Sequence, residues 1–183
     1  MSHHQASLFQ SPGRQSTLRV GPAGWNYKDW QGIVYPAGGS LDALAFLADY
    51  CDVIEINSSF YAPPRATNVA GWARRVRNNR RFRFTAKAWQ RLSHQRDKAD
   101  DVSLAADCGA VRRSMAPLME SGIMGALLIQ FPWKFRHTPE NQDYLARLFR
   151  HLRDFPLALE VRHSSWDHEP FYSFLREQGV AFC

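Results

Sequence analysis

Hydrophobic and polar positions follow two periods along this chain, and the two periods predict a series of strands and helices. Short runs rich in branched and aromatic residues, apolar at every second position, predict β-strands. Longer stretches with apolar residues three and four positions apart predict α-helices. The predicted strands span residues 18–20, 52–57, 82–87, 125–131, 157–162 and 180–183. The predicted helices span residues 41–50, 67–76, 100–121, 140–153 and 169–178.

A strand is followed by a helix five times, which is typical of parallel β-α-β units. Doubly wound sheets and eight-stranded barrels share this order, so the polar positions within the strands must separate them. A doubly wound sheet is covered on both faces and should be apolar on both. Here polar residues share one face of each strand and lie toward its carboxyl end, as at the catalytic end of a barrel. The pattern therefore predicts an α/β fold, a parallel (β/α)8 TIM-like barrel.

The predicted domain covers residues 18–183 and holds five strand–helix units and the start of a sixth strand. A barrel of this type needs about 250 residues. We therefore expect a barrel truncated after about five and a half units, that is, a fragment. Residues 1–17 are polar and without periodicity, which predicts a disordered tail.

Charged residues near the carboxyl ends of the predicted strands are the candidates for catalysis. Glu55, Lys87 and Glu160 take the inward position on three different strands. A carboxylate that faces an interior is costly unless it is paired or used. One glutamate could act as a base and the other as an acid, with Lys87 between them. The alternative is a structural ion-pair network in which Lys87 and Arg162 neutralise both glutamates.

Residues near these charges are candidates for binding a substrate. Lys87 and Arg162 could hold a carboxylate or phosphate, and the amides of Asn57 and Gln130 could orient substrate oxygens. The candidates in the loops are Trp25, Tyr27, Tyr61, His94, His163 and Trp166. Trp25 and Trp166 would wall the site and exclude water. The aromatic residues after the first strand could instead plug one mouth of the barrel, and His94 could be merely solvated.

Composition narrows the classes of protein. The chain is 45% hydrophobic, without a membrane-length apolar run or a signal-peptide pattern, so we expect a globular protein that uses no membrane. Three widely spaced cysteines predict reduced thiols and a cytoplasmic location. The net charge of +6, with nineteen Arg and four Lys, favours anionic partners, nucleic acid among them. The alternative is that the arginines lie on solvated helix faces.

Several well-known site motifs are absent from the sequence. The turn from Gly21 to Gly24 lacks the three-glycine fingerprint of a dinucleotide site. No His-x-x-x-His pair or carboxylate pair predicts a metal site, and no Gly-x-Ser-x-Gly elbow predicts a serine nucleophile. The sequence therefore names no cofactor, predicts no metal and leaves the oligomeric state open.

Four motifs together resemble a known family. They are Gly24-Trp25-x-Tyr27, Glu55-Ile56-Asn57-Ser58-x-Phe60-Tyr61, Phe82-x-Phe84-x-x-Lys87 with His94, and Glu160-Val161-Arg162-His163-x-Ser165-Trp166. In this order they resemble the YecE-like family, formally domain of unknown function 72, over residues 20–183. The resemblance implies a TIM-barrel-like fold and no established activity. Pro22-Ala23 stands where the family has Thr-Ser, and the family's later motifs are absent.

Two classes of function follow. The first is an enzyme that applies acid–base chemistry to a small anionic or polyhydroxylated substrate at the carboxyl-terminal rim of the barrel. The second is a protein that binds nucleic acid or phosphate without turnover. The position of the arginines discriminates between nucleic-acid binding and simple solvation. Arginines gathered beside the rim would favour nucleic acid, and arginines scattered around the helices would favour solvation.

Overall fold

The computed structural model describes residues 18–38, 41–96 and 100–183, so the predicted tail lies outside the described residues. Five parallel strands form one sheet in the order β1-β2-β3-β4-β5. The strands are β1 Val53–Ile56, β2 Arg83–Lys87, β3 Met124–Gln130, β4 Leu157–Glu160 and β5 Ala181–Phe182. The helices are α1 Ala43–Ala48, α2 Ala66–Arg75, α3 Asp101–Glu120, α4 Pro139–His151 and α5 Glu169–Gln178. Four 3-10 turns are η1 Lys28–Trp30, η2 Ser58–Phe60, η3 Gln90–Leu92 and η4 Ser164–Trp166.

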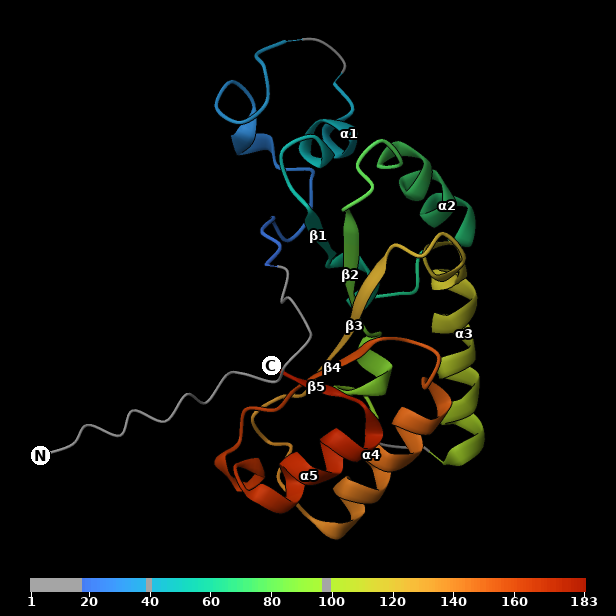
Figure 1. Ribbon diagram of the computed structural model, residues 1–183. Helices are drawn as coiled ribbons and strands as arrows, with labels where there is room; N and C mark the ends of the chain where they lie inside the picture. Colours follow the sequence, from blue (N-terminus) through green and yellow to red (C-terminus); the bar gives the residue numbers. More distant parts are fainter. Residues whose placement is uncertain (1–17, 39–40, 97–99) are drawn as a thin grey trace, which may run out of the picture.

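The two faces of the sheet differ in the way that the alternation of residues predicted. Helices α2, α3 and α4 lie side by side along one side of the sheet (Figure 1). The strand residues beneath the helices are apolar and almost inaccessible: Ile54, Ile56, Phe84, Ala86, Leu127, Ile129, Leu157 and Leu159. Glu55, Lys87 and Gln130 take the opposite face and remain half-buried. The predicted division of the strand residues between an apolar and a polar face is therefore observed, with the polar face opposite the helices.

Local signals fix where most of the helices begin and end. The carboxylate of Asp100 accepts a hydrogen bond of 2.7 Å from the Ser103 backbone N–H at the start of α3. Thr138 caps α4 in the same way, and Pro139 takes the first turn, where its missing N–H is not needed. Helix α5 ends at Gly179, whose φ of 65° suits a residue without a side chain. The boundaries therefore lie within two residues of the prediction for α2, α3, α4 and α5.

The predicted first strand is wrong. Residues 18–20 form no strand, and Leu18 and Val20 are exposed. Pairing with the sheet is limited to one bridge between Ala23 and Glu55, with a 3.0 Å bond from the Glu55 N–H to the Pro22 carbonyl. Pro22 has no N–H to donate, so the chain cannot continue a ladder here.

A closed barrel is not observed, because the five described strands form an open sheet from β1 to β5. A TIM barrel closes with eight strands. The part of the prediction that holds is a parallel α/β sheet with helices as crossovers. Strand β5 is two residues long, and both of its residues are exposed.

A single apolar core lies between the sheet and the helices. Its largest buried side chains include Phe82, Phe84, Phe131, Phe135 and Trp166. Burial raises the pKa of the Cys108 thiol to about 12, and all three cysteines are free. Of the helices in the described ranges, none has the length and apolar character needed to cross a membrane.

Candidate functional site

Polar side chains from four neighbouring strands meet at the carboxyl-terminal end of the sheet. Lys87, Gln130 and Glu160 are the last residues of β2, β3 and β4, and Asn57 directly follows β1. Because the strands are parallel, their carboxyl ends lie along the same edge. A hollow of about 340 Å³ opens here, lined by Asn57, Phe60, Tyr61, Lys87 and Gln130. The sequence had predicted four of these five residues as site residues, and Phe60 is the addition.

The charges at this end form two separate groups. The Lys87 Nζ lies 3.9 Å from the Glu55 Oε1, so this ion pair is loose. The second group is tighter: the Arg162 Nε donates to the Glu160 Oε1 at 2.9 Å, and the Gln130 Nε2 donates to the Glu160 Oε2 at 2.6 Å. No described ion pair joins the two groups. The predicted single network of four charges is therefore replaced by two pairs.

Glu55 and Glu160 are not brought together by any described contact. They lie on the first and fourth strands, three strand spacings apart, which is roughly 14 Å along a flat sheet. A carboxylate pair that acts on one bond is usually closer than about 9.5 Å. The open sheet therefore gives the two glutamates different surroundings and different partners.

His94 lies among positive charges. It follows η3, its Nδ1 is 2.9 Å from the Ser93 Oγ, and its ring packs edge-on against Phe60 at 5.0 Å. Burial, and then the positive charges of Arg162, Lys134 and Lys87, lower the pKa of His94 below its ordinary value. The imidazole is therefore neutral at neutral pH and can accept a proton.

Besides Phe60, two residues of this end were missed from the sequence. The Ser59 hydroxyl is buried and lies 2.7 Å from the carbonyls of both Ile56 and Lys87, so it ties the ends of β1 and β2 together. Ser59 occupies the undefined position of the motif Asn57-Ser58-x-Phe60, where a hydroxyl in the turn after a strand was the available signal. The charge of Lys134, in the loop after β3, helps to lower the pKa of His94. Lys134 was not predicted because it does not lie at the end of the strand itself.

The side chain of Asn57 carries an unused acceptor. Its Nδ2 donates to the Ala23 carbonyl at 3.4 Å, whereas its Oδ1 is buried and finds no hydrogen-bond partner among the described residues. A buried polar atom without a partner is unfavourable, and natural proteins satisfy most of them. The Asn57 Oδ1 is therefore an acceptor for which the described chain supplies no donor.

The prediction that Trp25 and Trp166 wall the site needs correction. Trp166 is 1% exposed, and its Nε1 donates to the Phe135 carbonyl at 2.8 Å. The Trp25 ring packs edge-on against Trp72 of α2 at 5.2 Å, on the side of the sheet that the helices cover. Trp166 is thus buried in the core, whereas Trp25 is half-buried and packs on Trp72 and Phe84. Neither indole lines the hollow.

The remaining predicted binding residues lie in loops. Tyr61 is 71% exposed beside the hollow, and its carbonyl accepts a 3.1 Å bond from the Trp89 Nε1. His163 is held in the turn after β4 by Ser165, and its ring lies 5.1 Å from the exposed Trp133. Tyr27 instead donates to the Ala23 carbonyl and packs on Trp30, so it stabilises its own loop.

Residues 18–38, 41–96 and 100–183 contain no preformed cluster of metal ligands. No three His, Cys, Asp or Glu side chains come together there in a way that could hold an ion. The chemistry that the described side chains offer is binding through Lys87, Arg162 and the amides, and proton transfer through carboxylates and a neutral imidazole.

The fold and this end of the sheet define a parallel α/β protein with a charged, half-buried hollow where the strands end. Within that class the chain belongs to the family described as "Protein of unknown function DUF72", whose model matches residues 19–183. The resemblance that the four sequence motifs indicated is thereby confirmed.

Similar proteins of known sequence or structure agree with this assignment. The chain is 32% identical over 167 residues to the UPF0759 protein YunF of Bacillus subtilis, a match that covers 88% of this chain and 58% of YunF. A crystal structure of a DUF72 family protein from Thermotoga maritima is 31% identical with a TM-score of 0.70, covering 90% of this chain and 63% of that one. One from Enterococcus faecalis is 31% identical with a TM-score of 0.66, covering 76% and 57%. The chain thus spans less than two thirds of the length of these relatives.

Proposed function

We propose that the protein is an enzyme that binds a small anionic, polyhydroxylated substrate at the carboxyl-terminal end of the sheet and transfers a proton on it. The observation that carries the proposal is the hollow at the carboxyl-terminal ends of the strands, which is lined by the cation of Lys87 and the amides of Asn57 and Gln130. His94 packs against Phe60 of this lining, and burial, then the charges of Arg162, Lys134 and Lys87, lower its pKa. A cation in the lining of a hollow favours an anion, and a neutral histidine close to it can take up a proton.

Binding would use the cations and the amides in different ways. Lys87 lines the hollow and has only a loose 3.9 Å contact with Glu55, so its ammonium can also reach an anion. The guanidinium of Arg162 keeps free N–H groups beyond the one that Glu160 accepts. The unused Asn57 Oδ1 would accept from a substrate hydroxyl. This donor and acceptor set supports a substrate that carries both a carboxylate or phosphate and hydroxyl groups.

In the proposal, Glu55 and His94 carry out the proton transfer. Both oxygens of Glu160 already accept hydrogen bonds, from Gln130 and Arg162, so its role is to orient those two side chains. In the described chain the carboxylate of Glu55 has no partner closer than the Lys87 Nζ at 3.9 Å, which leaves it open to a substrate proton. This assignment of roles differs from the one predicted from the sequence, in which the two glutamates act together as an acid and a base.

The proposed setting for this chemistry is a β/α barrel of the TIM type. The support is the half-buried polar face of the sheet, which has the character of a barrel interior, with the helices on the other face. The three free cysteines support a cytoplasmic location as part of the same proposal. The second candidate function is binding of a phosphate-bearing ligand at the same end without turnover, which the same cations would serve.

A thermal-shift screen of metabolite mixtures against the full chain tests the proposal. Charge-assisted hydrogen bonds contribute about 1.5–3 kcal/mol, so Arg162→Ala should weaken a stabilising anion at least tenfold. Arg176→Ala is the matched control, because Arg176 pairs with Glu169 on α5, away from the hollow. Equal affinity in the two variants would overturn the proposed binding site.

Turnover is tested with any ligand that the screen identifies. Incubation followed by mass spectrometry should show conversion, and Glu55→Gln should abolish it while the protein remains folded. If the ligand binds through Arg162 and is recovered unchanged, the second candidate function, binding without turnover, is the correct one.

A further inference from the structure

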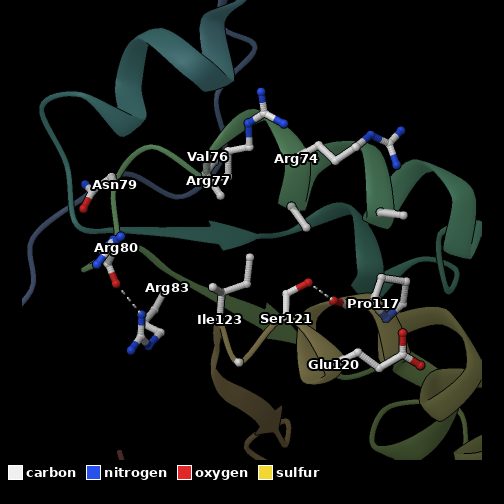
Figure 2. Close-up of a pocket in the computed structure, with 13 residues that line it drawn as sticks. Arg74, Val76, Arg77, Asn79, Arg80, Arg83, Pro117, Glu120, Ser121 and Ile123 are labelled. Carbon is white, nitrogen blue, oxygen red and sulfur yellow. Dashed lines mark hydrogen bonds between the residues drawn. The ribbon is translucent and has the colours of Figure 1, made fainter.

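A second and larger hollow lies at the opposite, amino-terminal end of the sheet. It measures about 590 Å³ and is enclosed by the end of α2, the start of β2 and the turn between α3 and β3 (Figure 2). Its apolar lining includes Ala73, Pro117 and Ile123. This volume lies within the range of about 300–1,000 Å³ that small-ligand sites occupy. The proposed function makes no use of this hollow.

The rim of the hollow is made of arginines. Residues 74–83 contain six of them, of which Arg75 pairs with Asp42 at 3.3 Å and Arg81 with Asp52 at 2.9 Å. The other four line the hollow: Arg74, Arg77, Arg80 and Arg83. Within the described ranges these four make no ion pair, and the carboxylate that lines the hollow is Glu120. The rim therefore carries a positive charge that its described surroundings do not neutralise.

The four side chains are spread around the hollow. Figure 2 shows Arg74 on α2 and Arg77 just after the end of α2, while Arg80 and Arg83 lie on the far side of the hollow. The Arg83 Nη1 donates to the carbonyls of Arg80 and Phe82, at 3.3 and 2.7 Å, which holds that side chain against the turn. One phosphate group cannot contact guanidinium groups that point in different directions, whereas successive phosphates of a polymer can.

We propose that this hollow and its arginine rim bind single-stranded nucleic acid, with backbone phosphates on the four arginines and a base in the apolar hollow. Arginine binds phosphate through a planar fork of N–H donors, and a positively charged groove that follows the backbone is typical of single-strand sites. A duplex keeps its bases stacked, so it presents the phosphates but no base for the hollow. The site is distinct from the anion site near His94, which lies at the other end of the strands.

The test uses the full chain and a fluorescent oligonucleotide of about 20 nucleotides, longer than the ~4–16 nucleotides of one single-strand site. Anisotropy measured over a range of KCl concentrations gives the affinity and its salt dependence. The variant is Arg77→Gln/Arg80→Gln; both positions are exposed, so the variant is expected to fold. The control is Arg113→Gln/Arg150→Gln, which removes the same charge from exposed positions on α3 and α4.

The site variant should bind at least tenfold more weakly, and the slope of log K against log salt should fall by about 1.4, since each lost phosphate contact changes it by ~0.7. The control should bind within threefold of the unmodified protein with an unchanged slope. Equal losses in both double variants would overturn the proposal in favour of diffuse charge. A duplex that binds as tightly as the single strand, or displacement by pyrophosphate at the same phosphate concentration, would also overturn it.

A further variant separates this site from the proposed enzyme site. Arg162→Ala should leave oligonucleotide binding unchanged, because Arg162 follows β4 at the carboxyl-terminal end of the sheet. Loss of oligonucleotide binding in Arg162→Ala, with binding retained in Arg77→Gln/Arg80→Gln, would assign the nucleic acid to the other end and refute the arginine rim.

Discussion

Replacing Glu160 with glutamine distinguishes a site residue from a structural one. The Glu160 carboxylate accepts hydrogen bonds from Arg162 and Gln130, and the substitution keeps its shape while removing its charge. Only 22% of the Glu160 side chain is exposed, whereas 53% of its partner Arg162 is. The partner is thus well hydrated, and it regains water when the carboxylate is lost.

The expected loss of stability follows from this exposure. An ion pair with one well-hydrated partner contributes about 0–1 kcal/mol, whereas breaking a fully buried pair costs about 3–5 kcal/mol. The glutamine oxygen at position 160 can still accept from one of the two donors. We therefore expect a fall in the free energy of unfolding of about 1 kcal/mol, which is a fall in Tm of ~2–4 °C for a chain of this size.

Thermal unfolding followed by circular dichroism measures this loss, with Glu169→Gln as the control. Glu169 also pairs with an arginine, Arg176, but on the exposed surface of α5, so its variant should be within about 0.5 kcal/mol of the unmodified protein. A fall of more than about 10 °C for Glu160→Gln, corresponding to roughly 3 kcal/mol or more, would refute the reasoning. The pair would then be a buried structural element, and the proposed site would lose one of its positioning residues.

Three further predictions concern protonation, backbone packing and thiol reactivity. Because burial and nearby cations lower the pKa of His94, the unfolded chain takes up this proton first as the pH falls below about 6.5, so His94 contributes stability above that pH that acidification removes. The Tm of the unmodified protein should therefore fall more steeply between about pH 7 and 5 than that of His94→Gln, and parallel curves would contradict this. Gly21→Ala should strongly destabilise the protein, because its Cβ would lie 1.6 Å from the Val53 carbonyl oxygen. Gly71→Ala, on an uncrowded face of α2, should instead stabilise it by about 0.5–1 kcal/mol. Denaturant titrations measure both changes, and the reverse order of stability would be inconsistent with the packing. Cys108, with its pKa raised to about 12, should resist a thiol reagent in the folded protein while the exposed Cys183 reacts, as peptide mapping after labelling would establish, and equal labelling would contradict the burial.

Much of the fold could be predicted from local pattern. Alternation within a strand decides which side chains share a face, because successive residues point to opposite sides. That rule separated the buried Ile54 and Ile56 from Glu55, and it also assigned Lys87 and Gln130 to one polar face. Caps such as Asp100 and Thr138 act over three residues, so the sequence also determined where those helices begin.

Contacts between distant segments were decided only by the tertiary structure. Trp166 is of a residue type that often stacks on ligands, yet its neighbours bury it. Residues 18–20 stay out of the sheet, although their pattern had predicted a strand. The charge environment of His94 comes from three different strand ends, and the arginine-rimmed hollow comes from elements that only packing brings together. Periodicity reports the direction of a side chain from its own backbone, whereas burial and electrostatic surroundings depend on what lies opposite. The sequence therefore determined the strand faces and the polar end of the sheet, and the tertiary structure decided which of those polar groups lie together.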